Sequence, residues 1–161
     1  MRKFEKISFN EFRKNNLGNE EEYNSYCVPR RHSAHSAGYD FELINDIVLK
    51  PKEVIKIATG IKVCMNYNDI LLLIVRSSTG FKYNVRLTNQ VGVLDSDYYN
   101  NPDNEGHIFL SVQNESDKEI VFEKKSRIVQ GIFVNYLVTD DDFTTEKRMG
   151  GLGSTGKGDK K

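Results

Sequence analysis

The sequence lacks the features that mark several classes of protein. Its 161 residues include only two cysteines, Cys27 and Cys64, which is too few for a disulfide framework and lacks the spacing of a metal site. The 23 basic and 23 acidic residues cancel to a formal net charge of zero, which argues against broad electrostatic binding to nucleic acid or anionic membranes. No apolar run is long enough to span a bilayer, and the charged N-terminus leads into no apolar stretch. We therefore expect a soluble, unsecreted, cytoplasmic protein.

Short strand-like runs separated by Gly, Asn and Asp dominate the chain from residue 41 onward. Residues 53–57 and 118–123 are two of them, and residues 70–75 form a continuously apolar run that predicts a strand covered on both faces. Apolar residues alternate at 108, 110 and 112, which predicts a strand with one buried face. With no sustained helical period, the pattern predicts an all-β single domain over 1–161, built as a sandwich, barrel or jelly roll.

Other segments are assigned more coarsely. Residues 77–83 are predicted to form the one short helix, capped by Ser77 or Ser78, and residues 4–12 fit either a strand or a helical turn. Residues 1–27 are predicted to be an N-terminal extension or first strand, and the glycine-rich residues 148–161 a mobile tail. The acidic runs at 20–22 and 140–142 are interpreted as solvated loops, and the three histidines, which lack metal-ligand spacing, as surface residues: His32, His35 and His107.

The stretch VGVLDSDYY at 91–99 carries the strongest chemical signal. Asp95 and Tyr98 stand three residues apart after an apolar turn that contains Gly92, and this pairing suits base recognition and water activation. If the apolar residues enter a β-hairpin, the glycine lets the backbone approach a ligand closely, and amides and carbonyls of the turn can read a flat heterocycle.

Three further stretches suit anion binding, although each has a structural alternative. Arg76, Ser77 and Ser78 follow an apolar strand and open the predicted helix, where amides, hydroxyls and a guanidinium can converge on a phosphate; the alternative is a plain helix cap beside a surface arginine. Residues 127–130 (RIVQ) place Arg and Gln three positions apart, and strict alternation sends their side chains to opposite faces unless the strand begins or bends there. The structural alternative is an edge strand whose polar side chains face solvent. The tail 148–156 (RMGGLGSTG) can wrap phosphates with unhindered amides and hydroxyls, or be a plain disordered terminus.

Together and in this order, these stretches resemble the five motifs of the trimeric dUTPase family. SAGYD at 36–40 resembles the first motif, RSS at 76–78 the second, GVLDSDY at 92–98 the third, RIVQ at 127–130 the fourth and RMGGLGSTG at 148–156 the fifth. The matches span residues 28–157. The resemblance implies a jelly-roll-like β-barrel (β-clip) homotrimer with active sites shared between subunits, no nucleic-acid or membrane partner, and Mg²⁺ carried by the triphosphate.

The resemblance also implies a role for each matched residue. Asp95 matches the base that deprotonates the attacking water, and Tyr98 matches the ring beneath deoxyribose that leaves no room for a 2′-hydroxyl. Asp40 matches a carboxylate near the water shell of the metal, and Arg127 is interpreted as structural support at the interface. The residues that match the uracil-reading turn are Asn89, Gly92, Val93 and Leu94. The residues that match phosphate-contacting or tail positions are Arg76, Ser77, Ser78, Gln130, Arg148, Leu152, Gly153, Ser154 and Thr155.

The implied reaction is hydrolysis of dUTP to dUMP and pyrophosphate by a dUTP diphosphatase. Attack of water on the α-phosphorus requires a positioned base, and the charge that grows on pyrophosphate requires Arg, Ser and Mg²⁺ nearby. Two other functions stay open: deamination of dCTP on the same fold, which needs a catalytic glutamate beside the pyrimidine, and a non-catalytic nucleotide-sensing or regulatory trimer.

Three features of this chain depart from the family pattern. Leu152 stands where family tails carry Phe, Lys147 competes with Arg148 for the arginine role, and residues 100–105 lengthen the loop between Tyr98 and Gly106. We expect this longer loop to lie near the site.

Overall fold

The computed structural model describes residues 1–146 and 148, and these residues form a predominantly β structure. One sheet has four strands in the order β2 (Tyr39–Glu42), β11 (Arg127–Asn135), β6 (Asp69–Val75) and β8 (Gly92–Asp95). A second sheet has three strands in the order β4 (Val54–Ala58), β9 (Phe109–Asn114) and β7 (Val85–Leu87). Two strand pairs complete the β structure, β1 (Lys3–Lys6) with β5 (Ile61–Cys64) and β3 (Ile47–Leu49) with β10 (Ile120–Phe122), and all these pairings are antiparallel.

The core lies between these sheets, where alternate residues of each strand are removed from water. Leu71 and Leu73 of β6 are at most 2% exposed, as is Val112 of β9, and all three belong to one apolar cluster. The alternating residues 108, 110 and 112 are all buried, which confirms the predicted one-sided strand. In β6 the opposite face, Ile70 and Leu72 included, is only half-buried, so the prediction of a strand covered on both faces is wrong for the single chain.

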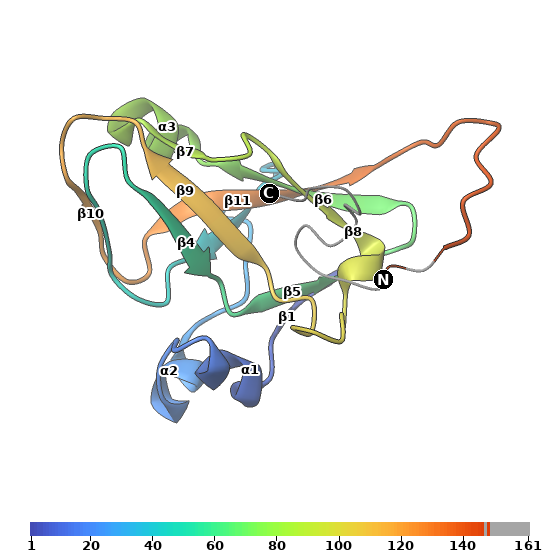
Figure 1. Ribbon diagram of the computed structural model, residues 1–161, viewed down its shortest axis with the longest axis horizontal. Coiled ribbons are helices and arrows are strands. Elements are labelled where there is room, and N and C mark those ends of the chain that lie inside the picture. Colours follow the sequence, from blue (N-terminus) through green and yellow to red (C-terminus); the bar gives the residue numbers. More distant parts are fainter. Residues whose placement is uncertain (147, 149–161) are drawn as a thin grey trace, which may run out of the picture.

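Two short helices follow β1, of which the second was not predicted. The sequence left residues 4–12 open between a strand and a helical turn, and the segment contains both, since β1 is followed by α1 (Phe9–Lys14). The acidic run at 20–22 opens α2 (Glu20–Ser25), because Asn19 and Glu22 form a reciprocal capping box; the prediction of a loop there is wrong. The two helices lie beside the β1–β5 pair (Figure 1). Aromatic rings pack this region, and the rings of Phe12 and Tyr26 are stacked 5.4 Å apart.

The predicted short helix is present as α3 (Ser77–Tyr83). Its N-cap is Arg76, in extended conformation and without a side-chain capping bond, so the prediction that Ser77 or Ser78 caps it is wrong. Its C-cap, Asn84, adopts a left-handed conformation with φ +53°, which ends the helix immediately before β7. Within the described residues, no helix is long and apolar enough to cross a membrane.

Candidate active site

The turn between β7 and β8 opens onto a cavity of about 340 Å³. The two flanking strands belong to different sheets, because β7 pairs with β9 whereas β8 pairs with β6. The turn is therefore not a simple β-hairpin, the arrangement considered from the sequence, because it crosses from one sheet to the other. The cavity is lined by backbone and side chains from both sheets and from the turn: Lys56, Leu73, Leu87, Thr88, Asn89, Gly92, Phe109, Leu110 and Ser111.

Gly92 is required by packing at this cavity. It pairs with Leu73 across β6 and β8, and a Cβ on the glycine would lie 3.1 Å from that of Leu73. Asn89 lies in the turn and lines the same cavity, whereas the side chain of Val93 points outward and is 57% exposed. Leu94 is half-buried against the core. Of the predicted base-reading residues, the structure thus places Asn89 and Gly92 around one cavity and Val93 outside it.

Asp95 ends β8 and serves as N-cap of the 3-10 helix Ser96–Tyr98. Its carboxylate is about half exposed at 49%, so it is reachable from solvent. The guanidinium of Arg148 bridges two carboxylates here, with Nη2 2.5 Å from Asp95 Oδ2 and Nε 2.9 Å from Asp97 Oδ1. The guanidinium carbon also lies 5.8 Å from the centre of the Tyr98 ring. Three predicted site residues, Asp95, Tyr98 and Arg148, therefore meet at one end of β8.

A second group of predicted residues surrounds a cavity of about 230 Å³ between β2, β11 and the start of α3. Asp40 is its charged centre, because Arg76 Nε lies 3.1 Å from Oδ1 and Arg127 Nη1 lies 3.3 Å from Oδ2. Arg76 also donates from Nη1 to the Arg127 carbonyl at 3.0 Å. Ser77 and Gln130 line the cavity, whereas Ser78 is exposed beside it.

A bulge in β11 lies between Arg127, which pairs with Asp40, and Gln130, which lines this cavity. The pairing of β11 with β2 shifts register between Arg127 and Val129, and this irregularity breaks the strict alternation that would send the two side chains to opposite faces. Gln130 packs against Gly38, where a Cβ would lie 1.9 Å from Gln130 Oε1. The absence of a side chain at Gly38 therefore makes room for the glutamine.

The two groups of residues lie at opposite ends of β6. Asp95 pairs with Ile70 at the beginning of β6, whereas Arg76 follows Val75 at its end. Six residues of extended chain separate Ile70 from Arg76, which corresponds to about 20 Å along the strand. Figure 1 shows the same separation, with α3 at one end of the molecule and the 3-10 helix after β8 near the N-terminus. One chain therefore holds its Asp95 and its Arg76 too far apart to contact one triphosphate together.

The structure also identifies residues near Tyr98 that sequence reasoning missed. His107 is fully buried, so its assignment to the surface is wrong. Its Nε2 accepts a hydrogen bond from the amide of Gly60 at 2.9 Å, and its Nδ1 lies 3.6 Å from Glu11 Oε1. This Nδ1 has no hydrogen-bond partner, and among the described residues it is the one buried side-chain nitrogen or oxygen without one. Burial lowers the pKa of His107 to about 4, against the opposing pull of Glu11. Its neighbours are Gly106, which has φ +76°, and buried Ile108, and neither property is visible in the sequence.

The predicted tail residues Leu152, Gly153, Ser154 and Thr155 lie outside the described residues, as does Lys147. The described part of the chain contains no group of three or more His, Cys, Asp or Glu side chains placed to hold a metal ion. Its two cysteines are unpaired.

Comparison with known proteins places these features in context. The family model described as dUTPase matches residues 24–156. A deoxyuridine 5′-triphosphate nucleotidohydrolase of Lactococcus lactis subsp. lactis (strain IL1403) is 48% identical over 131 residues, covering 80% of this chain and 87% of that protein. The crystal structure of a dUTPase from Streptococcus mutans superposes with a TM-score of 0.70 at 37% identity, covering 85% of this chain and 98% of that chain.

A more distant structure shares the fold. The dUTPase of phage phi11 of S. aureus, which coordinates a structural Mg(II) ion, superposes with a TM-score of 0.66 at 17% identity and covers 91% of this chain and 97% of that chain.

Proposed function

Because this chain belongs to the dUTPase family and is a dUTP diphosphatase, we propose that Asp95 is the base that activates the attacking water. The supporting observation is its position. Asp95 is a half-exposed carboxylate at the end of β8, and it pairs with the Arg148 guanidinium that lies over the Tyr98 ring. Gly92, at the other end of the same strand, lines the cavity. Asp97 shares the Arg148 contact but lies beyond the end of β8, inside the 3-10 helix.

In the proposed reaction, uracil enters the 340 Å³ cavity and deoxyribose rests against Tyr98. Asp95 accepts a proton from water as the water oxygen bonds to the α-phosphorus, and the bond from that phosphorus to its bridging oxygen breaks. Pyrophosphate leaves with the bonding electron pair. Backbone groups of the β7–β8 turn and Asn89 read the uracil edge, so cytosine is rejected by its reversed hydrogen-bond pattern.

Arg148 takes part by moving from one anion to another. In this structure its guanidinium pairs with both Asp95 and Asp97. A triphosphate competes for the same five donors, and drawing Arg148 onto phosphate leaves the Asp95 carboxylate free to accept a proton. Leu152, Gly153, Ser154 and Thr155 extend this phosphate contact along the tail in our proposal.

The second group of residues supplies the remaining phosphate contacts from another copy of the chain. Arg76, Ser77, Ser78 and Gln130 lie together but about 20 Å from the Asp95 of their own chain. A complete site therefore needs a neighbour, and we propose the shared-site homotrimer of the family, with Arg127 supporting the interface through Asp40.

The residues present fit a magnesium ion carried by the nucleotide. The described chain offers no three-ligand cluster, and Mg²⁺ prefers phosphate oxygens and water over an all-protein cage. Asp40 is the carboxylate that lines the phosphate cavity, where it can accept from water bound to the ion. When bound, Mg²⁺ neutralises charge that grows on the leaving pyrophosphate. We further propose that the enzyme acts in the cytoplasm.

The test compares two adjacent carboxylates. Asp95→Asn should keep binding of a non-hydrolysable dUTP analogue while kcat falls by about 10² to 10⁴, the range expected for loss of a general base. Asp97→Asn, which also loses an Arg148 contact, is the matched control and should retain turnover within about tenfold. Equal losses in both variants would remove the special role of Asp95.

Substrate preference is measured in parallel on the wild-type protein. We expect pyrophosphate release with Mg²⁺ from dUTP and much less from dCTP, dTTP and UTP. Ammonia released from dCTP would instead indicate the deaminase reaction, which the named relatives do not favour.

A further inference from the structure

The longer loop after the 3-10 helix turns back and holds the side chain of Tyr98. The Tyr98 hydroxyl accepts a hydrogen bond from Asn104 Nδ2 at 2.7 Å and donates one to the carbonyl of His107 at 3.0 Å. The tyrosine is only 7% exposed, so its hydroxyl depends on these two protein partners instead of water. Burial raises the pKa of Tyr98, and the donor from Asn104 acts in the opposite direction.

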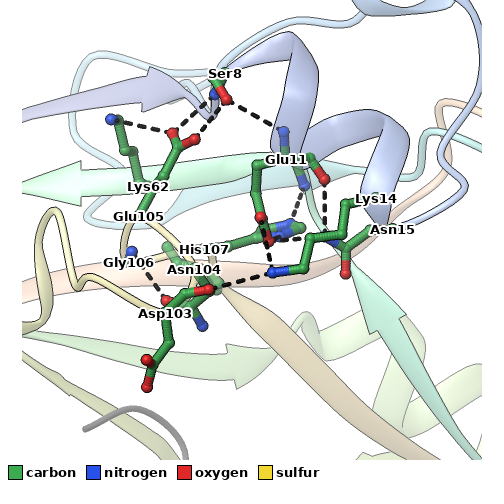
Figure 2. Close-up of polar contacts among 12 residues, drawn as sticks. Ser8, Glu11, Lys14, Asn15, Lys62, Asp103, Asn104, Glu105, Gly106 and His107 are labelled. Carbon is green, nitrogen blue, oxygen red and sulfur yellow. Dashed lines mark hydrogen bonds and ion pairs between the residues drawn. The ribbon is translucent and has the colours of Figure 1, made fainter.

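Asn104 is itself fixed by the turn in which it lies. Its Oδ1 accepts the amide of Gly106 at 3.0 Å, and its carbonyl accepts the amide of His107 at 2.9 Å (Figure 2). The side-chain amide therefore has one function on each atom: the oxygen closes the turn, and the nitrogen binds the phenol. This division allows the two functions to be separated by mutation.

The loop is anchored from outside by the N-terminal segment. The carboxylate of Glu105 accepts from the backbone amide of Ser8 at 2.9 Å and from its hydroxyl, and it lies 3.6 Å from Lys62 Nζ (Figure 2). Lys14 Nζ donates to the carbonyl of Asp103 at 3.3 Å. Ser8 and Lys14 precede residue 24, where the family match begins. Two of the anchors of the loop thus come from the segment that precedes the family match.

We propose that Asn104 is a positioning residue that fixes the Tyr98 ring and thereby sets the preference for deoxyribose over ribose. The inference rests on the proposed function, in which this ring lies beneath the sugar. A ring held at its hydroxyl by two partners cannot tilt without breaking a hydrogen bond, whereas a ring held only by His107 can shift by the fraction of an ångström that admits a 2′-hydroxyl.

Asn104→Asp isolates the contact. The aspartate keeps an oxygen for the Gly106 amide but replaces the nitrogen donor with a second acceptor. The single proton of the Tyr98 hydroxyl cannot serve both that acceptor and the His107 carbonyl, so one bond is lost. Asn100→Asp is the matched control, because it adds the same charge to the same loop and keeps the oxygen that accepts from Lys62 Nζ at 2.9 Å.

The measurement is kcat and KM for dUTP and for UTP in the full-length wild type and both variants. Loss of one hydrogen bond corresponds to about a three- to tenfold change, so we expect Asn104→Asp to lower the ratio of kcat/KM for dUTP to that for UTP by about that factor. Asn100→Asp should leave the ratio unchanged. A merely structural role for Asn104 would lower both activities in proportion.

A double-mutant cycle covers the case in which the aspartate variant does not fold. Asn104→Ala also loses the Gly106 contact, but that loss is common to the wild-type and Tyr98→Phe backgrounds and cancels in the cycle. We expect Asn104→Ala to change the dUTP/UTP ratio in the wild-type background and not in the Tyr98→Phe background. If Asn104→Ala leaves the dUTP/UTP ratio unchanged and the wild-type protein hydrolyses dUTP, the positioning role is overturned and the proposed function stands. A wild-type protein silent toward dUTP overturns the proposed function and this inference with it.

Discussion

Two inactive variants should restore activity when they are combined in one oligomer. Asp95→Asn removes the proposed base and Arg76→Ala removes a phosphate contact, and the two residues lie at opposite ends of β6. If a site takes Asp95 from one chain and Arg76 from another, a site built from one chain of each variant has both residues intact.

The expected recovery follows from random assembly. In an equal mixture, half of the chains supply an intact Asp95 and half an intact Arg76, so about one quarter of the sites are complete. The variants should be co-expressed with different affinity tags, and the doubly tagged fraction assayed for pyrophosphate release from dUTP. Its activity per site should approach the value expected from its composition, whereas either variant alone stays near background.

The control replaces one partner by the double variant Asp95→Asn/Arg76→Ala, which can complete no site. Co-expression of this chain with either single variant should restore nothing. Recovery that is absent from the first mixture as well, in oligomers shown to contain both tags, would refute the argument from the length of β6 and would require both residues to act within one chain.

Three further predictions concern stability and positioning. Gly106→Ala should lower the free energy of unfolding by about 1–3 kcal/mol in urea titrations, because φ is +76° and a Cβ would lie 2.4 Å from the Tyr98 carbonyl; a smaller loss would mean that the loop relaxes. His107, whose pKa is lowered to about 4, should make the protein lose stability as the pH falls from 6.5 toward 4, since the unfolded chain binds the proton first. The full loss is on the order of 3 kcal/mol by chemical denaturation, and His107→Gln should flatten the slope. Gly38→Ala should displace Gln130, whose Oε1 lies 1.9 Å from the added Cβ, and raise KM for dUTP while the melting temperature stays nearly constant.

The sequence predicted individual strands and the short helix at 77–83 better than it predicted how the strands pair. The alternation at 108, 110 and 112 and the helix at 77–83 follow from local patterning, and both are present. Pairing partners are not local: β7 and β8 read as one hairpin, but each pairs with a strand of a different sheet. The register shift that brings Arg127 and Gln130 together likewise depends on the pairing of β11 with β2.

The burial of polar residues was the other property that could not be predicted from the sequence. Spacing rules test whether a histidine can bind a metal, and they do not report that His107 fills a core position between Glu11 and Gly60. The charge of the acidic run 20–22 favoured a loop, whereas the N-cap at Asn19, which stabilises a helix there, was not considered. Of the proposed site, the residues were predicted from the order of motifs, whereas the 20 Å separation required the register of β6 with β8.

That separation has a genetic consequence. When each site draws its parts from different chains, a gene copy that encodes a folded subunit lacking both Asp95 and Arg76 does more than dilute the product of an intact copy. Mixed oligomers place this chain in two neighbouring sites at once, so in a cell with two alleles it removes about three quarters of the working sites, whereas loss of Asp95 alone removes about half. The length of a single strand, β6, would make inactivating substitutions at Asp95 partially dominant when they are combined with substitutions at Arg76 in the same chain.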